Sequence, residues 1–192
     1  MGLHPIVLIP RSDEDLESLE DHQAGEPPEV YVCRVAKAKR EHAIQRLYRS
    51  DKIQQPKPGD LIIAADTVVS LHGQILGKPA HEQAARAMLR QLSNTTHEVL
   101  TAVSLSRFDQ TAADSVLVRS KVTFAALSPQ WIEAYIASGE PFDKAGGYGI
   151  QGAAGSLIPH IAGSFSGIMG LPLYETLDLI HRVSRYGQPR AD

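Results

Sequence analysis

The sequence predicts one α/β domain over residues 1–192, in which a mixed, twisted sheet is flanked by helices. The chain has 192 residues, of which 43% are hydrophobic, so it can bury a core in one domain without a second independent unit. Apolar runs of strand length and helical repeats of apolar residues occur in the same chain but do not alternate strictly. This mixture favours helices packed against a mixed sheet.

Several segments have the pattern of strands. Ile6 to Ile9 is a short apolar run that ends at Pro10. Leu61 to Ala65 is apolar without interruption, which is typical of a strand buried on both faces, and this strand gives out at Asp66. The remaining expected strands are a hairpin over 68–76 that turns at His72 and Gly73, and a long antiparallel pair at 98–108 and 115–127.

Helical intervals between apolar residues predict four helices. The first begins at Pro28, a suitable first-turn residue, and extends to about Arg49. The other three are expected over 84–92, from Ser128 and Pro129 to Gly139, and from Pro172 onward, with 182–192 as a frayed tail.

Composition and charge narrow the classes of partner. The formal net charge is −3 and no long basic run occurs, whereas affinity for a nucleic-acid backbone comes from clustered lysine and arginine. Nucleic acid is therefore not the expected partner, and small anionic ligands remain open. The N-terminal apolar run is too short for a signal peptide, and no stretch is long enough to span a bilayer. The single cysteine, Cys33, excludes an internal disulfide framework, so we expect a cytoplasmic protein.

Residues 143–152, with the sequence DKAGGYGIQG, are the best candidate for a binding site. They combine a carboxylate, a lysine, four glycines and a glutamine amide without an apolar run. Because glycine gives up side-chain burial and costs backbone entropy, this segment suggests backbone bent closely around a polar ligand. A second polar segment, Asp66 and Thr67 followed by Gly77, Lys78 and Pro79, adds a carboxylate and a lysine. Together these groups could hold a polyphosphate and its metal.

The glycine-rich segment has two other interpretations. It is an ordinary surface connection if it lies apart from the second polar segment. Its glycines at 147, 149 and 152 also form a GxGxxG pattern, but a dinucleotide-binding loop requires a hydrophobic strand before the glycines and a helix that begins within them. The chain also lacks GxSxG, GxxxxGK[ST] and close histidine pairs, which argues against a serine-hydrolase elbow, a Walker loop and a zinc site.

Six segments together resemble the Maf family of nucleoside triphosphate pyrophosphatases. Four of them are ADTVV at 65–69, GKP at 77–79, DKAGGYGIQG at 143–152 and GSFSGIMGLPL at 163–173. The segments YVCRVAKAK at 31–39 and PRSDE at 10–14 resemble the family's lysine-bearing helix and its early acidic motif. The resemblance, which extends from about Ile6 to about Ile180, implies a Maf/inosine-triphosphatase-like fold, elongated, with two lobes around a central cleft.

The resemblance implies an enzyme that cleaves a nucleoside triphosphate between the α and β phosphates with a divalent cation, Mg²⁺ or Mn²⁺. The family's proton acceptor falls on Asp66, and a carboxylate can deprotonate or orient water directly or through a bound metal. The implied metal ligands are Asp66 and Glu14. The other interpretation of Asp66 is a turn carboxylate after a strand.

The resemblance also implies substrate-binding residues. Lys39, Lys78 and Lys144 match family lysines, which are suited to neutralise phosphate oxygens as charge develops on the leaving pyrophosphate. A uracil or thymine edge offers an N–H donor beside carbonyl acceptors, and the amide of Gln151 complements both. Thr67 and Gln151 mark the branch that acts on dTTP and UTP, as opposed to the branch that acts on 7-methyl-GTP. The alternative interpretation of Thr67 is a β-branched residue of a strand, and that of Lys39 is a lysine on the solvated face of a helix, both without a binding role.

One part of the family pattern is not found in this chain. Family members open with a strand, a loop of the form SxSPRR and a helix, and nothing before His4 matches them. Arginine forks make bidentate phosphate contacts that lysines cannot reproduce, so weak binding and slow turnover are expected. Gly167 also stands where the family often has asparagine.

Two classes of function therefore remain open. The first is a cytoplasmic pyrophosphatase that acts on dTTP, UTP and related, including modified, nucleotides. The second is a catalytically silent protein that binds nucleotides. In both, the expected partner is a nucleoside triphosphate, with no nucleic acid and no membrane, and a homodimer is an open alternative to a monomer.

Overall fold

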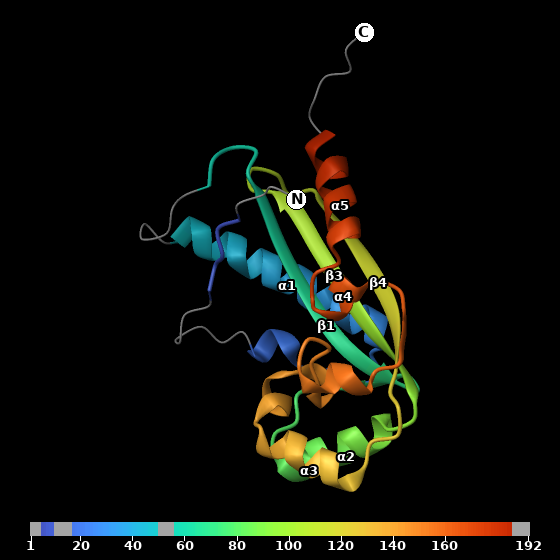
Figure 1. Cartoon of the computed structure of the whole chain (residues 1–192). Helices are drawn as coiled ribbons and strands as arrows, with labels where there is room; N and C mark the ends of the chain where they lie inside the picture. The colour runs from blue at the N-terminus through green and yellow to red at the C-terminus, as the bar shows by residue number, and fades with distance from the viewer. Residues whose placement is uncertain (1–4, 10–16, 50–55, 186–192) are drawn as a thin grey trace.

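A five-stranded sheet forms the centre of the computed structural model, which describes residues 5–9, 17–49 and 56–185. The strand order is β2-β1-β3-β4-β5, and every neighbouring pair is antiparallel (Figure 1). The strands are β1 (Leu61–Leu71), β2 (Gln74–Leu76), β3 (Thr96–Arg107), β4 (Ala113–Thr123) and β5 (His160–Ala162). The predicted class, a sheet flanked by helices, is therefore confirmed.

Two helices cover the long strands from opposite faces (Figure 1). Helix α1 (Pro28–Arg49) packs on β1 and β3 around the buried side chain of Leu100. Helix α5 (Leu173–Arg185) packs on β3 and β4, where Leu179 contacts the cluster that contains Val103. Successive side chains of a strand point to opposite faces, so β3 contributes Leu100 to one helix and Val103 to the other. Within the described residues, no helix is both long and apolar enough to cross a membrane.

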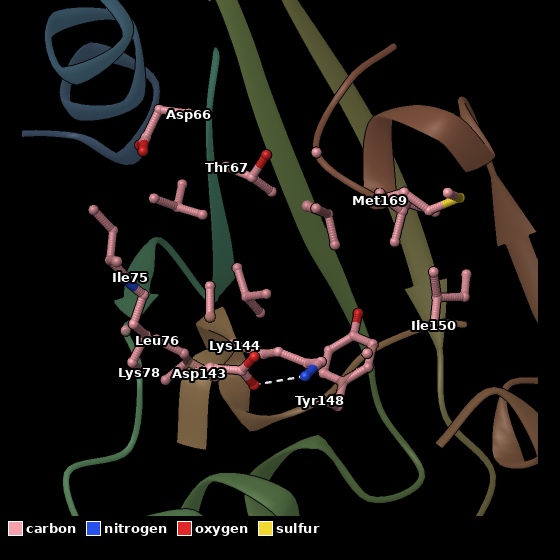
Figure 2. Close-up of a pocket in the computed structure, with 18 of the residues that line it drawn as sticks. Asp66, Thr67, Ile75, Leu76, Lys78, Asp143, Lys144, Tyr148, Ile150 and Met169 are labelled. Carbon is pink, nitrogen blue, oxygen red and sulfur yellow. Dashed lines mark hydrogen bonds and ion pairs between the residues drawn. The ribbon is translucent and has the colours of Figure 1, made fainter. Parts of the chain in front are cut away.

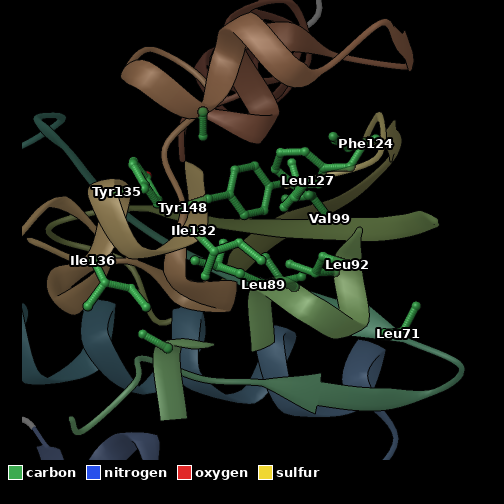
Figure 3. Packing of buried hydrophobic residues seen from close by; sticks show 14 residues of the cluster. Leu71, Leu89, Leu92, Val99, Phe124, Leu127, Ile132, Tyr135, Ile136 and Tyr148 are labelled. Atoms are coloured by element: carbon green, nitrogen blue, oxygen red, sulfur yellow. The ribbon is translucent and has the colours of Figure 1, made fainter. Parts of the chain in front are cut away.

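A group of short helices lies at one end of the sheet and has its own apolar core (Figures 1 and 3). Leu89 and Leu92 of α2 pack with Ile132 and Ile136 of α3 and with Phe124, which follows β4. The helices of this part are α2 (Glu82–Leu92), α3 (Pro129–Ala137), η2 (Glu140–Asp143), η3 (Ala145–Gly147) and η4 (Ala153–Leu157). Helix α4 (Phe165–Ile168) and the turn η1 (Glu17–Glu20) complete the described elements.

Local sequence signals explain several of these boundaries. The Ser128 hydroxyl accepts a hydrogen bond from the Trp131 N–H at 3.2 Å, so α3 begins with the predicted cap and first-turn proline. His72 and Gly73, with φ of 52° and 79°, form the predicted two-residue turn between β1 and β2. Cys33 of α1 is partly buried and packs against the apolar cluster that contains Leu100, and burial raises the pKa of its thiol.

The predicted strand at Ile6 to Ile9 is wrong. Residues 5–9 have no regular structure, and Ile6 and Val7 are exposed. The run is four residues long and lies between Pro5 and Pro10, which have no N–H to donate to a ladder. The Ile9 carbonyl instead accepts a hydrogen bond from Arg46 Nη1 at 2.7 Å.

Three further differences concern the sheet and the last helix. Strand β1 does not end before Asp66 but continues to Leu71, because Asp66 and Thr67 pair with Ala102 and Thr101 of β3. The described sheet is antiparallel, so the predicted mixed sheet is wrong. A parallel neighbour requires a crossover connection. Helix α2 instead lies at the end of the sheet, and the chain returns as β3 beside β1 in the opposite direction. Helix α5 extends to Arg185, beyond the expected start of a frayed tail. The two-lobed outline stays a prediction.

Candidate active site

A cavity of about 690 Å³ brings together segments that are far apart in the sequence. Elements η1, α1 and β1, the loop after β2, the glycine-rich segment and the end of α4 all contribute to its wall. Six of the predicted site residues line it: Lys39, Asp66, Thr67, Lys78, Lys144 and Gln151. The remaining one, Glu14, lies outside the described residues. Because the glycine-rich segment shares this wall with Asp66, it is not an isolated surface connection.

Two carboxylates share one ammonium group at the charged side of the cavity. Lys39 Nζ donates to Asp66 Oδ1 at 2.6 Å and to Glu20 Oε1 at 2.7 Å. The Asp66 side chain is only 9% exposed, compared with 24% for Lys39 and 34% for Glu20. The packing of α1 on β1 places Lys39 beside Asp66. Protein covers most of this ion pair, so the two charges attract each other more strongly than they would in water.

Burial separates the acid–base properties of the two carboxyl groups. Removal from water raises the pKa of Asp66, and the charge and hydrogen bond of Lys39 offset only part of this effect. Burial also raises the pKa of Glu20, but Lys39 and Lys78 outweigh it, so the net direction for Glu20 is downward. Burial lowers the pKa of Lys39, yet its two carboxylate partners raise it overall. Of the two carboxylates, Asp66 is therefore the one whose pKa the site raises, which favours its role as a proton acceptor.

Glu20 is a site residue that the sequence reasoning missed. It is one of several acidic residues between positions 13 and 20, and no local pattern distinguishes it from its neighbours. The Tyr31 hydroxyl donates to the Glu20 carbonyl at 2.8 Å and holds η1 against α1. This tertiary contact brings the Glu20 carboxylate to Lys39, so the signal that identifies it lies in the fold.

Lys78 and Lys144 add two further cations to the cavity wall. Lys78 Nζ lies 3.7 Å from Glu20 Oε2, and its side chain is 58% exposed. Lys144 Nζ donates to Asp143 Oδ1 at 2.5 Å (Figure 2) and to the Glu140 carbonyl at 3.2 Å. Together with Lys39, these lysines give the cavity three ammonium groups beside four carboxylates, those of Glu20, Asp66, Glu140 and Asp143, so the ammonium groups can contact a polyanionic ligand directly.

The glycine-rich segment is folded as short turns against the loop after β2. The Gly146 N–H donates to the Gly77 carbonyl at 3.0 Å, so a backbone hydrogen bond joins the two predicted polar segments. Gly146 has φ of 71°, in the left-handed region that favours glycine. A Cβ at this position would also lie 2.9 Å from a methyl carbon of Val69 on β1. Glycine therefore allows the segment to approach the sheet closely.

Tyr148 anchors the same segment in the core. Its ring packs edge-to-face on Phe124 with centroids 4.8 Å apart, and its hydroxyl lies 2.6 Å from His97 Nε2. His97 is 2% exposed, and its Nδ1 has no hydrogen-bond partner among the described residues. Burial lowers the pKa of His97 to about 4, so this histidine is neutral at pH 7.

We expect the neutral His97 to make the fold sensitive to acid. The pKa of His97 is about 4 when folded and 6.5 as a free side chain, so the unfolded chain binds the proton more readily between these values. Above pH 6.5, His97 is neutral in both states and does not lower the free energy of unfolding. As pH falls from 6.5 towards 4, protonation of the unfolded chain lowers that free energy. Urea unfolding at pH 7 and pH 4.5 should give a pH-dependent loss that is about 2–3 kcal/mol smaller in His97→Gln than in the parent chain. The exposed His160→Gln should retain the full loss; equal losses in all three proteins would contradict the assignment.

The other side of the cavity is apolar. Ile150 and Met169 lie on the side away from Lys78, with Thr67 between them and Asp66 (Figure 2). Ile168 also lines the wall, whereas the apolar side chains of Ile75 and Leu76 lie beside Lys78 (Figure 2). The cavity thus suits a ligand with one polyanionic end and one flat, less polar end.

The donor set of the site fits a divalent cation that arrives with phosphate. Among the described residues, no cluster of three or more histidine, cysteine, aspartate or glutamate side chains could hold a metal alone. Mg²⁺, however, is commonly bound by one or two carboxylates together with substrate phosphates. Asp66 and Glu20 supply two such carboxylates, and both form ion pairs with the ammonium group of Lys39.

Comparison with known proteins agrees with the geometry of the site. The sequence profile described as Maf-like protein matches residues 1–183. A protein from Albidiferax ferrireducens named dTTP/UTP pyrophosphatase is 45% identical over 180 residues, which cover 94% of this chain and 86% of the relative. Relatives with the same name from Ralstonia nicotianae and Cupriavidus pinatubonensis are 46% and 44% identical, over 94% and 95% of this chain and 84% and 88% of their own. The cavity brings together the motifs around Asp66, Lys78 and Gln151. The match to the family profile along most of the chain shows that this protein belongs to the Maf family.

Proposed function

We propose that this protein hydrolyses dTTP, UTP and related nucleoside triphosphates to the monophosphate and pyrophosphate. The observation that carries the proposal is the buried Asp66, with its raised pKa, in a cavity that has lysines on one side and apolar residues on the other. The names of the relatives, dTTP/UTP pyrophosphatase, support the same reaction and substrates.

In this proposal, Asp66 accepts a proton from the water that attacks the α phosphorus. The new bond joins the water oxygen to the α phosphorus, and the bond from that phosphorus to the bridging oxygen of the β phosphate breaks. Pyrophosphate leaves with the electron pair of the broken bond. Lys78 and Lys144 face the cavity where they can neutralise the charge that develops on the leaving group.

Asp66 and Glu20 are the residues that we propose to hold a divalent cation, Mg²⁺ or Mn²⁺. Such a cation, when bound, would neutralise phosphate charge. Lys39 contacts both carboxylates and keeps them close together. The base, the cations and the apolar wall among the described residues favour turnover over a catalytically silent binder.

A cytoplasmic location and a homodimer belong to the same proposal. The single cysteine supports a reducing compartment. A dimer is supported by exposed apolar side chains around α4 and the start of α5, namely Phe165, Met169, Leu171, Leu173 and Tyr174. Sedimentation velocity tests the dimer directly.

The reaction is tested by incubating the purified chain with UTP and Mg²⁺ and separating the products by anion exchange. We expect UMP and pyrophosphate in equal amounts. UDP with inorganic phosphate would point to cleavage at the other bridge, and no product with UTP or dTTP, with Mg²⁺ or Mn²⁺, would contradict the proposal.

Gln151 is expected to select the base. In Gln151→Glu, a carboxylate oxygen replaces the amide N–H₂ and faces a carbonyl of the pyrimidine, which costs about 1–3 kcal/mol when the substrate buries it. The ratio of kcat/KM for UTP to that for GTP should therefore fall about tenfold or more. Gln110→Glu, which adds the same charge in the exposed turn between β3 and β4, should leave the ratio unchanged. An equal loss for UTP and GTP in Gln151→Glu would mean that Gln151 shapes the segment and does not read the base.

A further inference from the structure

A pair of threonines connects the floor of the cavity to the turn after α4. Thr67 of β1 and Thr101 of β3 are direct cross-strand partners, and their hydroxyl oxygens lie 2.9 Å apart. Thr67 lines the cavity, whereas Thr101 is behind it and 1% exposed. The Thr101 hydroxyl donates to the Gly167 carbonyl at 2.7 Å. Thr101 can therefore influence a ligand only through Thr67 or through the turn at Gly167.

The direction of these hydrogen bonds follows from the donors available. A carbonyl oxygen only accepts, so the single proton of the Thr101 hydroxyl must point at Gly167. Two oxygens at 2.7 Å without a proton between them would repel each other in a buried site. Thr101 is then left with lone pairs alone, and the proton in the contact between the threonines must come from Thr67.

As a result, Thr67 presents only lone pairs to the cavity. Its one proton is held by Thr101, so its oxygen accepts from a ligand and does not donate. The neighbouring wall is fixed by the same carbonyl, because Gly167 O also accepts from the Gly170 N–H at 2.9 Å. Gly170 lines the cavity, and a Cβ at this position would lie 3.8 Å from Thr67 Oγ1. One buried hydroxyl thus sets both the polarity of Thr67 and the position of the turn beside it.

We propose that Thr101 is a positioning residue that makes Thr67 an obligate hydrogen-bond acceptor, so that the site prefers a nucleotide with an N–H or O–H donor at this point. This inference rests on the proposed pyrophosphatase function. UTP and dTTP share two groups that could supply the donor, the imide N–H of the base and the 3′-hydroxyl of the sugar. CTP has a bare nitrogen acceptor in place of the imide N–H, and 3′-deoxy-UTP has no 3′-hydroxyl.

The test compares Thr101→Val with Thr101→Ser. Valine keeps the shape and removes the hydroxyl, which frees the Thr67 proton, while serine keeps the hydroxyl. In Thr101→Val we expect the preference for UTP, measured as the kcat/KM ratio to CTP or to 3′-deoxy-UTP, to fall about five- to tenfold, mainly through KM. Thr101→Ser should keep the parental ratio. A change in the CTP ratio alone identifies the imide as the donor, and a change in the 3′-deoxy-UTP ratio alone identifies the hydroxyl.

Two outcomes would overturn the proposal. One is a Thr101→Val enzyme that loses activity equally on all three nucleotides, because a purely structural role lowers every rate without changing preference. The other is a Thr101→Ser enzyme that loses preference as strongly as Thr101→Val. If Thr101→Val does not fold, Thr67→Val, which removes the acceptor itself, must show the same loss of preference, and an unchanged ratio there also overturns the proposal. A parent chain without pyrophosphatase activity refutes the proposed function, whereas an active parent with unchanged ratios in the variants refutes this inference alone.

Discussion

Asp66→Asn should lower the rate of pyrophosphate release from UTP by at least about a hundredfold. General base catalysis contributes on the order of 10²–10⁴ in rate, and an amide cannot accept the proton from the attacking water. The substitution keeps the shape of the side chain, so the fold should remain intact. Initial rates with saturating UTP and Mg²⁺, together with thermal unfolding of the same samples, measure both effects.

Asp109→Asn is the matched control for this experiment. Asp109 is an exposed carboxylate in the turn between β3 and β4 and does not line the cavity. It should keep the parental rate, which shows that the loss in Asp66→Asn does not come from the change in net charge. If Asp66→Asn releases pyrophosphate as fast as an active parent, Asp66 is not the base. If it is inactive and also unfolded, Asp66→Glu, which retains a carboxylate, should be folded and more active than the asparagine variant.

Gly146→Ala should destabilise the protein by about 2–5 kcal/mol. An alanine pays about 1–2 kcal/mol for φ in the left-handed region. Its Cβ would also lie 2.9–3.0 Å from three carbon atoms of the buried Val69 side chain, and overpacking of this kind costs about 1–3 kcal/mol. Urea unfolding at pH 7 measures the change in free energy of unfolding.

Gly147→Ala separates the two contributions. Gly147 has the same φ of 71°, but a Cβ there would meet Pro79 at 3.5 Å, an ordinary contact distance. It should therefore lose only the conformational part, about 1–2 kcal/mol. Equal losses in the two alanine variants would show that the approach to Val69 is not what requires glycine at position 146.

The sequence predicts most of the site because its chemistry is carried by short segments with unusual composition. Asp66 with Thr67 interrupts an apolar run, Lys78 lies between a glycine and a proline, and the glycine-rich segment combines charges with four glycines. The structure places all of them on one cavity. Lys39 was less distinctive, because a lysine on a helix normally faces solvent, and only its match to the family pattern singled it out.

Glu20 and the Ile6 to Ile9 segment could not be predicted for opposite reasons. Glu20 has an ordinary local sequence, and its role arises from a contact between η1 and α1. The Ile6 to Ile9 segment has the local pattern of a strand, but a ladder also requires N–H donors along its length, and prolines border the run on both sides. The continuation of β1 through Asp66 likewise depends on its pairing with β3 and not on its own residues.

The backbone hydrogen bond between Gly146 and Gly77 has a consequence for how the site meets its ligand. Lys78 directly follows Gly77, and Lys144 lies two residues before Gly146, although residues 79–143 lie between the two lysines in the chain. The entropy of closing that long loop is therefore lost when the protein folds and not when a nucleotide binds. The backbone positions that carry the two lysines are thus held together before a triphosphate binds, so that binding has to order only the lysine side chains.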